Sequence, residues 1–296
     1  MAPAVSRLES AFSHCEALVR EQDPDRYWSS LFAPADKRPY LFALYAFSIE
    51  ISRVRDCISA PLPGEIRYQW WRDVLDGITS GDPGDYAADG AAHPIAEALI
   101  ATIMQFQLPI QALHDLIDAR VFDLYDDMMP SLNDLEGYCG ETSSVLFRLA
   151  SIILCNGNEP GGADVAGHAG VSYAITGLLR ALPWHLRRGQ VFLPADILAE
   201  SGLNRDSILA STSDAALLPV VTRMRDIAQA HFMEAQDSIS AVAPEARAAF
   251  LPIATIPAYL SQTKRRGYAP RRSLINLPQW HRLWTIWRAS RRWRAL

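Results

Sequence analysis

The chain of 296 residues has few cysteines, no long apolar run and, beyond residue 245, no acidic side chain. Its four cysteines are scattered without metal-site spacing, which is typical of reduced thiols rather than of a disulfide framework. They are Cys15, Cys57, Cys139 and Cys155. No segment reaches the apolar length of a spanning helix, and the N-terminus lacks the apolar stretch of a signal peptide. These absences predict a cytoplasmic protein.

Charge is unevenly distributed along the chain, whose net charge is −5. Ten Lys and Arg residues fall between Lys264 and Arg294, and no Asp or Glu follows Glu245. The rest of the chain therefore carries 18 basic against 33 acidic residues, a net charge of −15. A basic tail on an acidic body favours an anionic partner, either a membrane surface or an acidic protein face. The alternative is a solvated tail, or one that folds back on the body. No nucleic-acid-binding module is visible, so nucleic acid is not an expected partner.

Apolar residues recur at three- and four-residue intervals over most of the chain, which predicts amphipathic helices. The composition, 49% hydrophobic and 21% charged, is that of a globular protein with a substantial core. No Gly/Ser-rich linker divides the chain. We therefore predict an all-α fold, a single-domain helical bundle around a central cavity. The expected helices span 4–21, 37–58, 64–79, 93–106, 108–126, 132–156, 164–181, 214–242 and 244–266.

Two segments resemble the signatures of the squalene/phytoene synthase family, but both have lost acids. The first, YLFALYAFSIEISRVRDCIS at 40–59, keeps the family's Tyr-Ala-Phe at Tyr45 and its neighbours. Ser52 and Arg53 stand where the family has paired aspartates, and Asp56 matches the closing aspartate. One carboxylate does not build a magnesium site, because Mg²⁺ takes several oxygen ligands.

The second segment, GLLRALPWHLRRGQVFLP at 177–194, keeps the family's frame with Ala181 and His185 at its two aspartate positions. Alanine offers no ligand, and an imidazole nitrogen suits zinc or iron better than Mg²⁺. Pro183 lies between them and removes a helical N–H. We therefore expect the helical geometry that would pair positions 181 and 185 to be lost.

Matches at 69–77, 116–139 and 259–270 extend the resemblance over nearly the whole chain. It implies the isoprenoid (terpenoid) synthase fold over residues 1–275, followed by a tail helix over 276–296. The pattern of lost acids resembles that of a non-catalytic branch of the family, which assists the assembly of respiratory complex I. Members of this branch also have an acid such as Glu50 in the first segment. The resemblance thus implies a protein that binds an isoprenoid-like lipid or complex I assembly intermediates, without metal or other cofactor. The alternative is an active head-to-head prenyltransferase that uses prenyl diphosphates and Mg²⁺.

The resemblance also implies where a ligand would bind. The expected cavity residues are Tyr45, Arg53, Asp56, Ala174, Gly177, Arg180, Ala181, His185 and Tyr259. The expected anion-binding residues are Arg53, Arg180, Arg187 and Arg188; the last two are alternatively solvent-facing. Asp56 and His185 are the candidates for catalysis. The alternatives are that Asp56 pairs with a nearby arginine and that His185 has a structural role.

Two further surfaces stand out in the sequence. An acidic helix face would either bind a cation or be solvated, and it carries Asp118, Asp123, Asp126 and Asp127. In the tail, Trp280, Trp284 and Trp287 share a helical stripe. The arginines expected to lie off this stripe are Arg282, Arg288 and Arg292. Such a helix suits peripheral contact with the inner face of a membrane. The alternative is docking on the domain's own surface with the arginines reaching outward.

Overall fold

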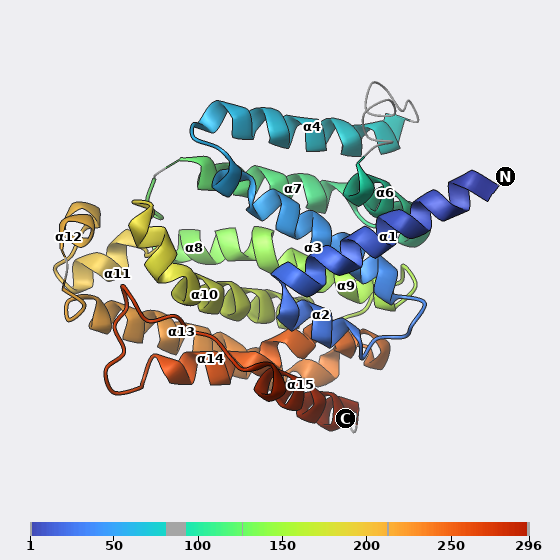
Figure 1. Cartoon of the computed structure of the whole chain (residues 1–296). Helices are drawn as coiled ribbons and strands as arrows, with labels where there is room; N and C mark the ends of the chain where they lie inside the picture. Colours follow the sequence, from blue (N-terminus) through green and yellow to red (C-terminus); the bar gives the residue numbers. More distant parts are fainter. Residues whose placement is uncertain (1, 81–92, 126, 212, 295–296) are drawn as a thin grey trace. The chain divides into compact units, whose positions relative to one another are not determined.

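The computed structural model describes residues 2–80, 93–125, 127–211 and 213–294, and its elements in these ranges are helices (Figure 1). The only β-type pairing in the described ranges is an isolated bridge between Gly161 and Val242. The all-α prediction is therefore confirmed. None of the described helices is long and apolar enough to cross a membrane.

The helices sort into two compact units whose segments interleave along the chain. The first unit spans Met1–Tyr125, Leu146–Gly161 and Val242–Leu251, and the second spans Asp126–Val145, Gly162–Ala241 and Pro252–Leu296. Because the chain passes between the units several times, no single linker separates them. The predicted boundary at residues 275/276 and the central cavity stay predictions.

The first unit is built around α3, an apolar helix that packs against α1, α2 and α6. Its elements are α1 (Ala2–Gln22), α2 (Pro24–Ser30), α3 (Arg38–Ser52), η1 (Val54–Cys57), α4 (Pro61–Ser80), α6 (Pro94–Phe106), α7 (Ile110–Val121), η3 (Phe122–Leu124) and most of α9 (Val145–Leu154). Trp71 of α4 is fully buried, with its ring edge-on to Phe47 of α3 at 5.0 Å between centroids. Trp71 is thus part of the core, and an aromatic pair of this kind adds about 1 kcal/mol to the burial of its area.

The second unit is built around α10, which packs against α13, α8, α14 and the π-helical turn η4. Its elements are α8 (Leu132–Cys139), η4 (Gly140–Ser144), α10 (Ala163–Arg187), α11 (Ala195–Glu200), α12 (Arg205–Ala210), α13 (Leu217–Asp237), η5 (Ile239–Ala241), α14 (Ile256–Gln262) and α15 (Gln279–Arg294); the 3-10 helix η6 (Pro244–Thr255) begins in the first unit and ends in the second. Ser144 Oγ donates to the Gly167 carbonyl at 2.9 Å. The backbones approach so closely that a Cβ on Gly170 would lie 2.3 Å from Ser144 Cα, so only glycine fits there.

The prediction that Pro183 disrupts its helix was wrong. Helix α10 continues through Pro183 to Arg187, so Ala181 and His185 keep their i, i+4 relationship. Pro183 lies in the last turns of the helix, where it removes one backbone hydrogen bond, and it is buried. Burial of its ring offsets part of that loss.

Several predicted helices extend beyond the observed α-helices; the segment predicted over 108–126 is α7 followed by η3, and the one predicted over 214–242 is α13 followed by η5. The segment predicted as one helix over 37–58 is α3 up to Ser52, followed at Val54 by the 3-10 helix η1. The segment predicted over 244–266 is the 3-10 helix η6 followed by α14. Pro252 lies inside η6 and has no backbone N–H to donate.

Candidate functional site

One face of α10 carries four of the predicted cavity residues. Ala174, Gly177, Ala181 and His185 follow one another at spacings of three or four, so they lie on the same side of the helix. Each is partly exposed, in contrast to the buried residues on the opposite side. A Cβ on Gly177 would meet no heavy atom within 4 Å. This face, which we call the α10 face, therefore combines small side chains with open space beside Gly177.

His185 lies at the C-terminal end of the α10 face and is held by an aromatic contact. Its ring centroid lies 4.7 Å from that of Phe192, and its carbonyl accepts a hydrogen bond from the Gln190 N–H at 2.9 Å. Gly189, with φ of 74°, turns the chain back so that Phe192 reaches the imidazole. This packing favours the structural role for His185.

Arg180 and Tyr259, both predicted site residues, meet in a basic cluster. The Arg180 guanidinium carbon lies 3.9 Å from the centroid of the buried Tyr259 ring. Arg282 of α15 donates from Nη2 to Tyr259 Oη at 3.1 Å and to Asn276 Oδ1 at 3.4 Å. Two guanidinium groups thus contact one phenol, by a cation–π contact and by a hydrogen bond. The cluster concentrates positive charge within the second unit.

Sequence reasoning assigned Arg282 to the tail and missed its place in this cluster. A usable signal was present, because a residue two positions after Trp280 lies about 160° from it around a helix of 3.6 residues per turn. If the tryptophan stripe faces outward, Arg282 must face the protein body.

The other two predicted anion-binding residues of α10 lie on the surface. Arg187 and Arg188 are exposed, and the Arg187 guanidinium carbon lies 5.3 Å from the centroid of the exposed Trp184 ring. Their positions match the solvent-facing alternative. The structure therefore brings together Arg180, Tyr259 and Arg282, with Arg187 stacked elsewhere.

Tyr45 of α3 is buried beside a charged pair in the first unit. The guanidinium carbon of Arg26 lies 5.1 Å from its ring centroid, and Arg26 pairs with Asp23 at 3.1 Å. Burial raises the pKa of Tyr45 to about 12; Arg26 opposes this rise and Asp23 adds to it. The phenol is consequently neutral and unsuited to act as a base near neutral pH.

The remaining predicted residues of the first segment lie where α3 gives way to η1. Arg53 and Asp56 are exposed, and the Asp56 N–H donates to the Arg53 carbonyl at 2.9 Å. Glu50 forms an ion pair with Arg67 of α4. The acid nearest the lost aspartates is thus already engaged by an arginine. Pairing of the Asp56 side chain with an arginine stays a prediction.

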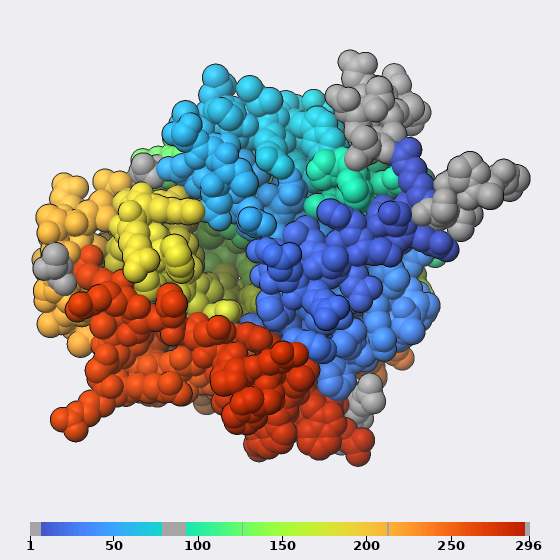
Figure 2. Space-filling model, viewed as in Figure 1, coloured from blue at the N-terminus to red at the C-terminus, as the bar shows by residue number. Residues whose placement is uncertain are grey.

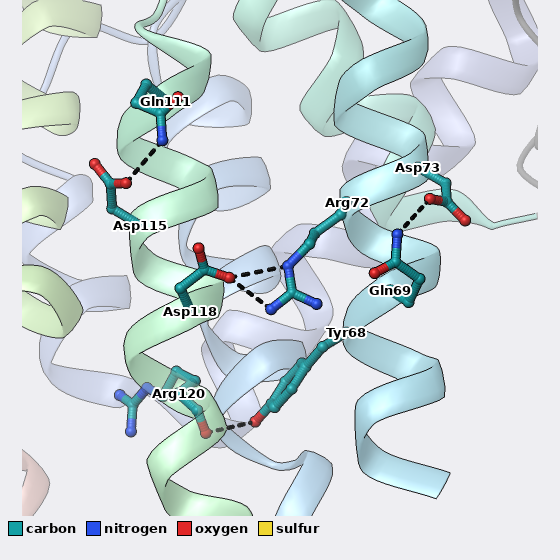
Figure 3. Close-up of polar contacts among 8 residues, drawn as sticks. All are labelled: Tyr68, Gln69, Arg72, Asp73, Gln111, Asp115, Asp118 and Arg120. Carbon is teal, nitrogen blue, oxygen red and sulfur yellow. Dashed lines mark hydrogen bonds and ion pairs between the residues drawn. The ribbon is translucent and has the colours of Figure 1, made fainter. Parts of the chain in front are cut away.

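Two of the four predicted acids, Asp118 and Asp123, are engaged by arginines, as Figure 3 shows for Asp118, and Asp127 is exposed. Arg72 of α4 donates to Asp118 at 2.9 and 2.5 Å, and Asp123 pairs with Arg120 at 2.9 Å. Asp126 lies outside the described residues. Because Asp118 and Asp123 are neutralised by neighbouring guanidinium groups, these two acids are poor candidates for a cation site.

The residues present do not fit a magnesium–diphosphate cluster. At the i, i+4 positions that α10 preserves, a methyl group and an imidazole replace the oxygen ligands that Mg²⁺ requires. In the first segment, Arg53 adds positive charge beside Asp56. Across the described ranges, no group of three His, Cys, Asp or Glu side chains is placed to hold a metal ion.

The helical fold and the two altered signatures define the class of protein. The family model for squalene/phytoene synthase matches residues 19–287, and the chain belongs to that family. Squalene synthase HpnC from Alicyclobacillus acidocaldarius superposes with a TM-score of 0.74 at 24% identity, covering 89% of this chain and 96% of that one. The predicted family and isoprenoid synthase fold are thus confirmed.

Individual relatives include both assembly factors and enzymes. NADH dehydrogenase (ubiquinone) complex I, assembly factor 6 from Rattus norvegicus is 32% identical over 254 residues, covering 85% of this chain and 73% of that protein. The 15-cis-phytoene synthase from Synechocystis sp. is 25% identical over 251 residues, covering 81% and 72%. The predicted resemblance to the assembly-factor branch is confirmed.

Proposed function

We propose that this protein acts by binding rather than by catalysis, in the assembly of respiratory complex I. The observation that carries the proposal is an intact helical frame without its acids. Ala181 and His185 keep the spacing at which the family's enzymes carry aspartates, but they supply no carboxylate. Similarity to complex I assembly factor 6 at 32% identity supports the assembly role.

The energetic argument concerns the first step of prenyl transfer. An allylic diphosphate ionises when metal ions and cationic side chains stabilise the charge that develops on the leaving group. Without bound Mg²⁺, that step loses several kcal/mol of transition-state stabilisation. Arg180 supplies one positive charge, but its guanidinium lies against Tyr259.

The α10 face is the proposed binding surface. Its alanine and glycine side chains leave room beside Gly177, where an apolar chain would fit. Arg180 lies on the same helix and would offer positive charge to an anionic head group. An isoprenoid-like lipid matches this combination; the other proposed occupant is a protein surface of a complex I assembly intermediate.

The catalytic question is tested by incubating the purified protein with farnesyl and geranylgeranyl diphosphates plus Mg²⁺, and quantifying lipid products and pyrophosphate. We expect no product above a heat-inactivated control, from protein shown by circular dichroism to be folded. The double variant Ala181→Asp with His185→Asp places carboxylates at these two positions, which α10 already holds at the i, i+4 spacing. Its product yield is compared with that of the wild type. Product formed by the wild-type chain would contradict the proposal.

The second candidate is a head-to-head prenyltransferase, which the 25% identity to a phytoene synthase favours. It would need Asp56 as the remaining acid of the first signature, helped by arginines. If the wild-type chain forms product, Asp56→Ala should abolish turnover. An unchanged rate in that variant would remove Asp56 from the mechanism.

The assembly role is tested in the organism that carries the gene. Deletion should lower both assembled complex I and NADH:ubiquinone oxidoreductase activity, and the wild-type gene should restore them. Gly177→Leu fills the open space on the α10 face, whereas Gly137→Leu adds the same side chain at an exposed position of α8 that is also free of contacts. We expect Gly137→Leu to complement and Gly177→Leu to fail. Normal complex I in the deletion strain would refute the assembly role.

A further inference from the structure

Helix α15 is fixed to the second unit by one of its faces. Ile286 and Trp293 are buried on that face, and Arg282 is only 7% exposed. Arg282 reaches Tyr259 and Asn276, so the helix is held by both apolar packing and hydrogen bonds. The orientation of α15 about its axis is therefore set by contacts on this side.

The opposite face of α15 presents three tryptophans to solvent. Trp280, Trp284 and Trp287 are 70%, 51% and 52% exposed. At about 100° per residue, the three lie within roughly 60° of one another around the helix, spread over about 10 Å of its length. In the space-filling view, the red C-terminal residues form part of the outer surface (Figure 2). Exposed aromatic area of this kind marks an interaction surface.

Arginines accompany the tryptophans on the exposed side. Arg288, Arg291 and Arg292 are exposed, and the Arg288 guanidinium carbon lies 5.4 Å from the Trp284 ring centroid. Arg291 falls within the tryptophan stripe, one turn beyond Trp287. No acidic residue follows Glu245 in the sequence, so α15 carries positive charge without acids of its own.

We propose that α15 lies on the surface of an anionic lipid bilayer, with Trp280, Trp284 and Trp287 in the interface. Three aligned indoles on one side of a straight helix can reach a flat surface together, and an indole suits the boundary between head groups and acyl chains. The flanking arginines complement lipid phosphates of the same surface. Docking of the tryptophans onto the protein body is excluded by their exposure, because α15 uses its other face for that contact. This proposal does not depend on the assembly role.

Two contributions to membrane binding are expected, one from the charge of the arginines and one from the burial of the tryptophans. Each arginine near an anionic surface is worth about 1 kcal/mol, so losing two of them should weaken binding about 30-fold. Burying half-exposed indoles contributes on the order of tenfold per tryptophan. The arginine contribution should shrink as salt rises, whereas the tryptophan contribution should not.

The test is co-flotation of the full chain with phosphatidylcholine vesicles and with mixed phosphatidylcholine–phosphatidylglycerol vesicles. We expect tight binding to the mixed vesicles and quenching of tryptophan emission by brominated acyl chains. A triple variant, Trp280→Ser, Trp284→Ser and Trp287→Ser, should lose both. Its matched control replaces two exposed methionines elsewhere, Met104→Ser and Met233→Ser, and should bind as the wild type does.

Charge is tested separately with Arg291→Gln plus Arg292→Gln, against a control of equal net charge, Arg20→Gln plus Arg223→Gln, at exposed sites outside α15. Only the first pair should weaken binding. Circular dichroism checks that each variant remains folded. The proposal is overturned if the wild type does not float with the mixed vesicles at low salt, if it binds neutral vesicles equally well, or if the triple tryptophan variant binds undiminished.

Discussion

Gly170 and Gly177 lie seven residues apart on α10 and should respond in opposite ways to the same substitution. A Cβ on Gly170 would lie 2.1 Å from Ser144 Oγ and 2.3 Å from both Ser144 Cα and N. These distances are far below the contact of about 3.5–4 Å that carbon atoms favour. Two of the three atoms belong to the backbone, so rotation of a side chain does not relieve the clash.

The magnitudes follow from two competing effects. Replacing a helical glycine with alanine gains about 1 kcal/mol, because the unfolded chain loses conformational freedom. Overpacking a tight contact costs about 1–3 kcal/mol, and a backbone clash belongs at the upper end. We therefore expect Gly170→Ala to lose about 2 kcal/mol of stability. Gly177→Ala, whose Cβ meets no atom within 4 Å, should gain about 0.5–1 kcal/mol.

The assay is urea unfolding of both variants and the wild type, followed by circular dichroism. The midpoint of Gly170→Ala should fall and that of Gly177→Ala should rise, with a difference of about 3 kcal/mol between the variants. Gly137→Ala on α8, another glycine with an open Cβ, serves as a second positive control. If Gly170→Ala proves as stable as Gly177→Ala, the close approach of α10 to η4 is wrong.

Three further predictions concern single side chains. Burial lowers the pKa of His93 below its ordinary 6.5, so the unfolded chain binds a proton more readily than the folded chain does. The free energy of unfolding should therefore fall as the pH drops below 6.5. His93→Asn keeps an N-cap for α6 and should flatten this pH dependence, measured by urea unfolding at each pH. Tyr259→Phe removes a hydrogen-bond acceptor of the buried Arg282 and should lower the free energy of unfolding by about 1–3 kcal/mol. An unchanged denaturation midpoint would mean that this hydrogen bond contributes nothing to stability. Asp23→Ala removes both the N-cap of α2 and the partner of Arg26, and should lower the thermal midpoint through a loss of about 1–2 kcal/mol, whereas Asp23→Asn should retain most of the cap.

The sequence predicted the helical class and the family because both depend on local information. Apolar spacing reports a helix wherever it occurs, and the altered signatures are readable residue by residue. The prediction failed at Pro183, where the rule that proline breaks helices was applied to a position near the helix end. Burial of that ring within the unit offsets part of the lost hydrogen bond, and the sequence alone does not report this burial.

For the candidate site, too, some features were predictable from the sequence and others were not. The family resemblance predicted Ala174, Gly177, Ala181 and His185 as cavity residues, but Pro183 led to the wrong expectation that positions 181 and 185 would lose their helical pairing. In the structure all four lie on one face of α10. The sequence gave no sign of the open space beside Gly177, because the volume next to a helix depends on which elements pack there.

The covalent sequence by itself determined that the carboxylates of a magnesium site are missing, since no packing supplies an oxygen ligand at Ala181 or His185. It also determined the concentration of arginine and tryptophan in the tail. Tertiary structure decided which side of α15 is covered, and so turned Arg282 inward and Trp280 outward. Helical periodicity fixes the angle between two side chains around an axis, but the direction that faces the core is set by the neighbouring elements.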